Sequence, residues 1–209
     1  MLAIVPTLLL AAADGGSARL DAWLKACAAD AGVPSTCAVN PRTEPVTVVV
    51  DVDGREARVL VRGKEAARYE VGQGQAEGPK QWRGDLRTPR GTYFVVGKST
   101  GPFGGTFGGY YGGIWLKVNY PGPVDAARGV DAGVITAAQA DSISASWSER
   151  KATPQGTKLG GGIGFHAWVD EWDGADGGYL LSWGCLVVHP RDAQDFYRRV
   201  PIGAPVVLL

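Results

Sequence analysis

Near its C-terminus the chain reads Ser182-Trp183-Gly184-Cys185-Leu186-Val187-Val188-His189-Pro190, and the assignment of the fold rests on this stretch. The apolar run from Leu186 to Val188 lies close before a proline, which predicts a short strand. A glycine and a cysteine come directly before that run. The cysteine could be a buried packing residue, half of a disulfide, a metal ligand or a nucleophile, and the rest of the sequence ranks these four interpretations.

The composition bounds the class of protein. The chain has 209 residues, enough for one domain with a substantial core. Its 21 Lys and Arg balance 21 Asp and Glu, and no basic patch stands out, so nucleic acid and anionic membrane surfaces are poor candidate partners. The 31 glycines and 7 tryptophans favour a β-rich, turn-rich protein with aromatic surfaces. No stretch approaches the roughly 20 apolar residues that span a bilayer.

Residues 1–13 are apolar and end in an Ala-x-Ala pattern, which is typical of a secretion signal. The basic residues that normally begin such a signal are missing, so a core strand or helix remains an alternative. Cleavage near Ala13 would leave a chain beginning at Asp14. We therefore predict a periplasmic or secreted protein that is associated with the cell envelope and has no membrane span after cleavage.

Residues 14–45 predict a small helical segment. Between Ser17 and about Asp30, apolar side chains recur at helical spacing, at Leu20, Trp23, Leu24 and Cys27. Cys37 follows within ten residues of Cys27, so a Cys27–Cys37 disulfide is expected in an exported protein, with two reduced cysteines as the alternative. Pairing Cys27 with Cys37 leaves Cys185 alone, and an odd cysteine in an exported protein is a candidate reactive thiol.

The body of the chain predicts a mostly β fold with a few peripheral helices. The β-branched run Val46–Val52 precedes Asp53-Gly54, a dipeptide favoured in tight hairpins. Further strands are predicted at residues 57–61, 66–71, 92–96, 113–118, 163–168, 179–182 and 205–209. Helices are predicted at residues 136–148 and 192–200, with smaller turns around 124–128.

His166 is the candidate partner of Cys185. The sequence has only two histidines, His166 and His189. If His166 and Cys185 lie on adjacent strands, the imidazole can take the thiol proton, lower the thiol pKa and supply the thiolate that attacks a carbonyl. Gly184 would let the backbone approach a substrate and direct N–H groups at a developing oxyanion.

Several separated motifs then resemble one family. His166 is followed, after residues 167–181, by Ser182-Trp183-Gly184-Cys185, where the family has Ser/Thr-His-Gly-Cys. Upstream, Gly84–Phe94 resembles the pattern G-D-x-x-T-P-x-G-x-(Y/F), and Val71–Gly74 and Lys117–Pro121 match neighbouring family segments. Residues 192–207 match its helix followed by a VP-G-PV strand. Over residues 46–209 the chain thus resembles the L,D-transpeptidase catalytic domain, the YkuD-like family.

The resemblance implies an L,D-transpeptidase-like β-sandwich or open barrel and a set of roles. Cys185 would be the nucleophile, His166 the base, and the Ala167 carbonyl would orient the imidazole, while N–H groups around Gly184 and Cys185 would form the oxyanion hole. The substrates implied are peptidoglycan stem peptides, attacked through a thioester without any cofactor or metal. Residues flanking the pair are expected to bind substrate: Ser182, Trp183, Phe165, Trp168 and Tyr179.

Two departures from the family pattern bear on the activity. Trp183 replaces the family histidine two places before the cysteine, and Val187 replaces the usual arginine two places after it, which removes a candidate clamp for a substrate carboxylate. Residues 119–162 form a long insertion that could carry a lid or an acceptor site. Transfer to an amine, L,D-carboxypeptidase action, hydrolysis of links between a protein and peptidoglycan, and a catalytically weak cell-wall binding module therefore stay open.

The remaining motifs have two interpretations each. A zinc site of His166, Cys185 and His189 is disfavoured, because residues 186–188 predict a strand. His189 is otherwise expected to be a capping or surface residue. The acidic stretch Trp168–Asp176 is either a solvated loop or a site for the free amine of the stem's diaminoacid. Tyr110 and Tyr111, among glycines, belong either to a mobile loop or to a surface that stacks on glycan.

Overall fold

The computed structural model describes residues 17–27, 38–106, 108–174 and 177–209. The secretion signal predicted for residues 1–13 and the predicted disulfide partner Cys37 lie outside these ranges, so both stay predictions. Within the described ranges, no helix has the length and apolar character that crossing a membrane requires.

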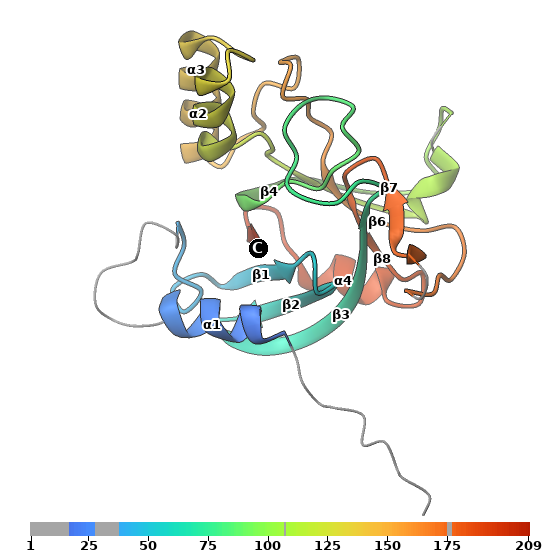
Figure 1. The fold of residues 1–209 in the computed structure, drawn as a ribbon. Helices are drawn as coiled ribbons and strands as arrows, with labels where there is room; N and C mark the ends of the chain where they lie inside the picture. Colours follow the sequence, from blue (N-terminus) through green and yellow to red (C-terminus); the bar gives the residue numbers. More distant parts are fainter. Residues whose placement is uncertain (1–16, 28–37, 107, 175–176) are drawn as a thin grey trace, which may run out of the picture.

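The strands form a barrel, and the predicted mostly β class is confirmed (Figure 1). Around the barrel the order is β2-β1-β9-β4-β5-β6-β8-β3, and a β2–β3 pairing closes it. β7 adds to β3 as an extra strand outside the ring. The bounds are β1 Val46–Asp51, β2 Glu56–Val61, β3 Lys64–Gly74, β4 Gly91–Thr100, β5 Ile114–Val118, β6 Gly164–Ala167, β7 Leu180–Ser182, β8 Leu186–Val188 and β9 Pro205–Leu208.

The barrel is closed, whereas the sequence predicted a sandwich or open barrel, and the reason lies in β3. This strand is 11 residues long and pairs with β2 along its first part, from Lys64 to Glu70. Its last part pairs with β8 at Val71 and Gly72 and with β7 at Gln73 and Gly74. One strand thus belongs to both halves of the sheet, which leaves no open edge between β2 and β8.

The alternation of side chains along β1 divides the apolar residues between two layers. Val48 and Val50 point into the barrel and belong to its core, while Val49 between them faces outward and packs under α1 (Ala18–Cys27). All three valines are fully buried, and burying such a side chain stabilises a fold by roughly 1.5–3 kcal/mol. The helix predicted over residues 17–30 is confirmed for its described part.

Helix α4 (Ala193–Arg199) supplies an aromatic plug to the barrel core. Phe196 is fully buried and its ring lies 5.3 Å from that of Tyr69 and 4.9 Å from that of Phe165. Tyr69 is also tied to the helix, because its hydroxyl donates to Asp195 at 2.7 Å. The predicted helix over residues 192–200 is therefore confirmed.

The long insertion folds into a helical pair beside the barrel (Figure 1). α3 (Ala137–Ser148) confirms the helix predicted over residues 136–148, and it is capped by Thr136, whose hydroxyl accepts from the Gln139 N–H at 3.3 Å. α2 (Pro123–Asp131) is a full helix where the sequence predicted only turns. The sequence did not predict this helix because it contains Gly129, and glycine disfavours helices. In the structure α2 packs closely at this glycine, since a Cβ there would lie 3.0 Å from Ile135 and 3.1 Å from Leu159.

Candidate active site

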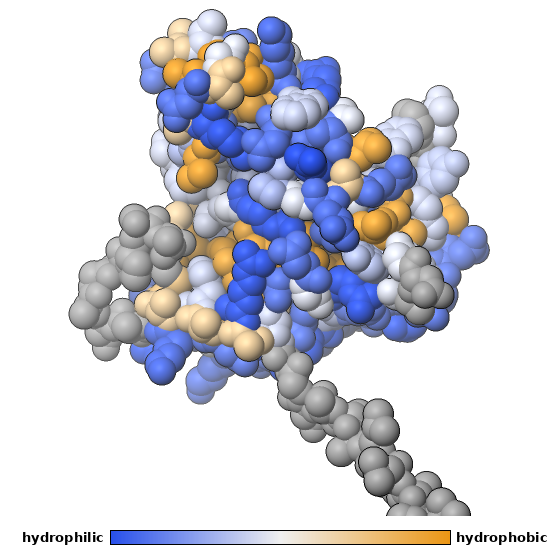
Figure 2. Space-filling model, viewed as in Figure 1, coloured by the Kyte–Doolittle hydropathy of each residue, from blue (hydrophilic) through white to orange (hydrophobic). Residues whose placement is uncertain are grey.

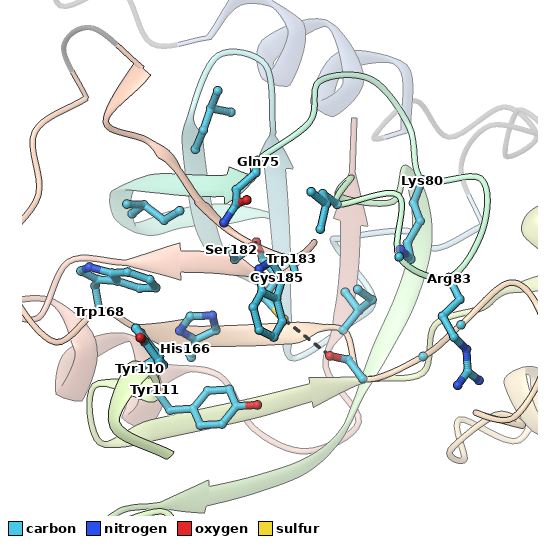
Figure 3. A pocket seen from close by; sticks show the side chains of 18 residues that line it. Gln75, Lys80, Arg83, Tyr110, Tyr111, His166, Trp168, Ser182, Trp183 and Cys185 are labelled. Atoms are coloured by element: carbon cyan, nitrogen blue, oxygen red, sulfur yellow. Dashed lines mark hydrogen bonds between the residues drawn. The ribbon is translucent and has the colours of Figure 1, made fainter. Parts of the chain in front are cut away.

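One cavity of about 790 Å³ brings together the residues that the sequence singled out (Figure 3). Cys185, His166, Ser182, Trp183 and Trp168 all line it. The other lining residues come from loops elsewhere in the sequence: Gln75, Lys80, Arg83, Gly84, Leu86, Tyr110, Tyr111, Gly160, Gly161, Gly162, Ile163, Leu180 and Leu181. Figure 2 shows hydrophobic side chains gathered near β7, the strand that carries Leu180 and Leu181.

The turn before β8 fixes the position of the thiol. The Ser182 hydroxyl donates to the Cys185 carbonyl at 2.6 Å and accepts from the Gly184 N–H at 3.1 Å. Gly184 has φ +128°, and a Cβ there would lie 2.6 Å from the Arg87 carbonyl oxygen, so only glycine fits. The buried Ser182 hydroxyl is thus used inside the turn, and it positions Cys185.

Strand register places His166 next to this turn. β6 and β8 run parallel and pair His166 with Val187, two residues after Cys185. The His166 Nδ1 lies 2.7 Å from the Ala167 carbonyl oxygen. A carbonyl can only accept, so Nδ1 carries the proton and Nε2 is left as the basic nitrogen. Figure 3 shows the imidazole beside Cys185.

Burial favours the neutral form of both the thiol and the imidazole. Burial raises the pKa of the Cys185 thiol to about 11, while a Gly164 backbone N–H and the charge of Lys80 act against this. Burial also lowers the pKa of His166, opposed by the backbone carbonyls of Ala167 and Tyr110. The expectation that the Cys–His pair would hold the thiol pKa low is therefore wrong: desolvation outweighs the neighbours.

Two residues predicted to bind substrate lie elsewhere. Phe165 is fully buried in the barrel core against Phe196 and does not line the cavity. The burial of Phe165 follows from the alternation of side chains along β6, because His166 points to the cavity and its neighbour on the strand must point the other way. Tyr179 lies before β7, outside the cavity, with the Arg55 guanidinium 4.8 Å from its ring centre. Phe165 is therefore not a substrate-binding residue, while the role of Tyr179 stays a prediction.

Aromatic side chains form one end of the cavity. The short helix η1 (Gly108–Tyr111) crosses the end of β6 so closely that a Cβ on Gly112 would lie 2.4 Å from the Trp168 carbonyl oxygen. This approach places Tyr111 edge-on to His166, with ring centres 5.2 Å apart, and Tyr110 beside Trp168 at 5.5 Å. Trp183 lines the cavity and is 57% exposed, so it belongs to the rim and not to the core.

The opposite end of the cavity is cationic, and the sequence analysis missed it. Lys80 is buried and its ammonium donates to Asp85 at 2.7 Å. Asp85 also accepts from the backbone N–H groups of Gln81, Trp82 and Arg87, and these bonds outweigh burial and lower its pKa. The carboxylate thus shapes the loop that carries Lys80 and Arg83 to the cavity. Both cations come directly before the Gly84–Phe94 motif in the sequence, and this proximity was the signal that could have identified them.

Gln155 connects the two sides of the cavity and also escaped the sequence analysis. Its side-chain oxygen accepts from the Gly162 N–H at 2.7 Å, and the Gly162 carbonyl lies 3.5 Å from the Cys185 sulfur. Its side-chain amide donates to the Tyr120 and Thr153 carbonyls. Of the long insertion, only Gly160–Gly162 line the cavity, and α2 and α3 lie apart from it.

His189 lies outside the cavity, and it is neither a cap nor a surface residue. It is 2% exposed, stacked on Trp172 at 3.8 Å, and its two nitrogens lie 3.0 Å from Glu171 and 3.3 Å from Glu70. Glu171 also accepts from Arg191, so it is not available to a substrate amine. In the part of the chain that the structure describes, no group of three or more His, Cys, Asp or Glu is arranged to hold a metal ion.

Among the solved structures similar to this chain, one with a TM-score above 0.5 supports the fold. The helical cell shape determining protein Pgp2 from Campylobacter jejuni is 21% identical with a TM-score of 0.52, covering 78% of this chain and 46% of that one. Bd1075 from Bdellovibrio bacteriovorus is 20% identical with a TM-score of 0.49, covering 79% and 48%. A mutant L,D-transpeptidase from Enterococcus faecium is 18% identical with a TM-score of 0.45, covering 79% and 50%.

This chain therefore spans about half the length of the solved structures that it matches. A search of curated proteins finds no match. The sequence profile of the YkuD family, described as the L,D-transpeptidase catalytic domain, matches residues 45–208. That match covers most of the chain and includes both Cys185 and His166. The chain belongs to the L,D-transpeptidase catalytic domain family.

Proposed function

We propose that this protein is a cysteine acyltransferase that acts on peptidoglycan stem peptides in the cell envelope, in the periplasm or outside the cell. The observation that carries the proposal is the joint placement of Cys185 and His166 in one cavity, with the imidazole held as the tautomer whose Nε2 is basic. Membership of the family supports the substrate class. A protein linked to peptidoglycan through such a stem would be a second partner.

In the acylation step, Cys185 attacks the carbonyl of the diaminoacid in the stem. The thiol proton passes to His166 Nε2 as the carbon–sulfur bond forms. The carbon–nitrogen bond then breaks, and the imidazolium returns its proton to the leaving amine of the terminal D-residue. Because both groups are neutral beforehand, the proton leaves the sulfur during the attack and not before it.

The second step frees the thiol again. An acceptor amine attacks the thioester carbonyl, His166 takes a proton from that amine, and the sulfur leaves and is reprotonated by the imidazolium. Water in place of the amine would give hydrolysis by the same atoms. The Ala167 carbonyl stabilises the imidazolium in both steps, since it accepts from Nδ1.

The oxyanion that forms in each step needs N–H donors. The Gly184 N–H already donates to Ser182, so we assign the Cys185 N–H as the main donor from this turn and Gly184 as the residue that makes the turn possible. Trp183 stands where the family histidine would be, on the exposed rim, where it can contact the stem without entering the proton transfer.

The test is intact mass spectrometry of the chain with tetrapeptide stems, compared between the wild type and Cys185→Ala. We expect an acyl adduct on the wild type alone, with release of the terminal D-residue. Addition of an amine acceptor should then clear the adduct as a cross-linked product. If the adduct clears only to free tripeptide, the protein is a hydrolase on the same scaffold. Binding to peptidoglycan without adduct or product would replace the proposal with a cell-wall binding module.

A further inference from the structure

The charges around the cavity are of one sign. Among its lining residues, all of them described, the charged side chains are Lys80 and Arg83, and no carboxylate is present. Figure 3 shows these two cations at one end and Tyr110 and Trp168 at the other, with Cys185 between the two ends. A ligand that fills the cavity therefore meets an aromatic end and a cationic end on opposite sides of the thiol.

The two cations differ in how far they are already neutralised. The Lys80 ammonium is 3% exposed and forms a 2.7 Å ion pair with Asp85, so its charge is compensated inside the protein. Arg83 is exposed, and among the described residues its guanidinium forms no ion pair. It donates only to neutral groups, the carbonyls of Gln155 at 2.9 Å and Thr157 at 3.2 Å.

These two carbonyls also hold Arg83 in place. Its backbone N–H donates to the Lys158 carbonyl at 2.8 Å, so both the main chain and the side chain of Arg83 are fixed to the 155–158 segment. Both side-chain bonds use the same terminal nitrogen, which leaves the other N–H groups of the fork for a ligand. A fixed, uncompensated guanidinium is well suited to bind a carboxylate.

Position 187 makes this assignment specific to this chain. The arginine that would follow the cysteine by two places is replaced by Val187, which is fully buried in the barrel wall and pairs with His166. No cation can reach the cavity from there. Arg83 supplies a cation to the cavity from a loop about a hundred residues earlier in the chain.

We infer that Arg83 binds a carboxylate of the substrate and selects stem peptides that present one at the cationic end of the cavity. The inference rests on the proposed function, because the substrate class comes from there. Two sources of carboxylate exist in such a stem: the free end of the terminal D-residue, and the side chain of a diaminoacid such as diaminopimelate. With the scissile carbonyl at Cys185, each lies within about one residue of the reacting bond.

The experiment measures kcat/KM of the wild type and of Arg83→Gln with three tetrapeptide stems. The first is unmodified, the second has a C-terminal carboxamide, and the third has lysine in place of diaminopimelate. We expect Arg83→Gln to lower kcat/KM for the unmodified stem by about 10- to 100-fold, mainly through KM. With the wild type, one of the two modified stems should show the same drop in kcat/KM relative to the unmodified stem. For that stem, Arg83→Gln should lower kcat/KM no further, and this identifies the carboxylate that Arg83 binds.

This comparison separates recognition from structural damage. Arg83→Gln also weakens the contact with the 155–158 segment, but a loosened loop would slow all three stems alike and would not remove the difference between acid and amide. Arg83→Lys, which keeps the charge without the fork, should restore part of the preference. Arg198→Gln is the matched control, because Arg198 lies on α4 outside the cavity and its side chain is 73% exposed.

Binding supplies a readout that does not need turnover. The same three stems are titrated into Cys185→Ala and into Cys185→Ala with Arg83→Gln, and the same pattern of affinities is expected. If each modified stem binds more weakly than the unmodified stem by the same factor with and without Arg83, the inference is wrong. Turnover of the unmodified stem by the wild type would in that case still support the proposed function. If the wild type shows no turnover but the binding pattern appears, the proposed function fails and the carboxylate site remains. Absence of both overturns both.

Discussion

The two histidines of this chain lie in regions with opposite chemistry. Both are buried, since His166 is 4% exposed and His189 is 2% exposed. His166 lies on β6, and His189 directly follows β8, the strand that pairs with β6. The partners of His166 are neutral backbone carbonyls, with Nδ1 2.7 Å from the Ala167 oxygen, and its imidazole lies beside a thiol. Both nitrogens of His189 lie beside carboxylates, Nδ1 at 3.0 Å from Glu171 and Nε2 at 3.3 Å from Glu70. The partners, and not burial, separate a candidate base from a structural ion pair.

The same substitution at both positions should break this comparison most clearly. In His166→Gln we expect kcat/KM with tetrapeptide stems to fall by about 10³- to 10⁴-fold, because proton transfer by a positioned base contributes this much. The free energy of unfolding should change little, since glutamine is of similar size and its amide can still donate to the Ala167 carbonyl. Steady-state kinetics and urea denaturation measure the two quantities. A His166→Gln enzyme that retains a tenth of the activity would remove the imidazole from the mechanism.

Reactivity of the thiol should sharpen the comparison next. Because the pKa of Cys185 is raised from 9.0 to about 11, its thiolate fraction at pH 7 should be about 100-fold below that of an unperturbed cysteine. Alkylation by iodoacetamide should accordingly be slow at pH 7 and rise about tenfold per pH unit toward pH 11. Intact mass against time measures the rate, with the urea-unfolded chain as the reference for an unperturbed thiol.

Catalysis should depend on pH in a different way from alkylation. The lowered pKa of His166 keeps the imidazole neutral, and therefore basic, through pH 7 and below its ordinary titration range. Activity should be lost only when the pH falls through that lowered pKa, where the imidazole gains a proton. A preformed thiolate–imidazolium pair would instead give fast alkylation at pH 7, and this result would contradict the assignment of two neutral groups.

The turn that presents the thiol gives the next prediction. Gly184→Ala should lower kcat/KM by about 100-fold, because the added Cβ would lie 2.6 Å from the Arg87 carbonyl oxygen and the turn must shift Cys185 to relieve the contact. The control is Gly177→Ala, at a glycine that also has a positive φ, +82°, but no atom within 4 Å of the added Cβ. Kinetics of both variants would show whether misplacement of the sulfur, and not backbone strain in general, causes the loss. Equal activity in the two would contradict this account.

The sequence predicted most strands because their evidence is local. Val46–Val52, Ala57–Val61 and residues 92–96 are β-branched or aromatic runs bounded by turn residues, and each lies on a strand of the structure. Barrel closure could not be predicted in this way. It depends on β3 pairing with β2 and with β8, and the pairing of Val71 with Val188 joins residues more than a hundred positions apart.

The site was predictable to the same extent. The motif around Cys185 and its spacing from His166 identified the pair, and strand alternation alone would have excluded Phe165 once His166 was placed in the cavity. The cationic end was not predictable, because Lys80 and Arg83 reach the cavity through a loop that Asp85 and the 155–158 segment hold. For His189, the deciding partners Glu70 and Glu171 lie on separate segments, 119 and 18 positions before it in the sequence.

The smallest expected effect belongs to His189→Gln, which completes the comparison of the two histidines. Glutamine carries both of its N–H donors on one nitrogen, so it does not reproduce the two ring nitrogens that lie beside Glu70 and Glu171, and it loses the stacking on Trp172. Both carboxylates are nearly half exposed, which screens the pair, so we expect a loss of only about 1–2 kcal/mol in the free energy of unfolding. Because His189 does not line the cavity, kcat/KM should stay within about threefold of the wild type. Urea denaturation and steady-state kinetics measure both, and a His189→Gln protein of full stability but lost activity would show that this buried ion pair serves catalysis and not the fold.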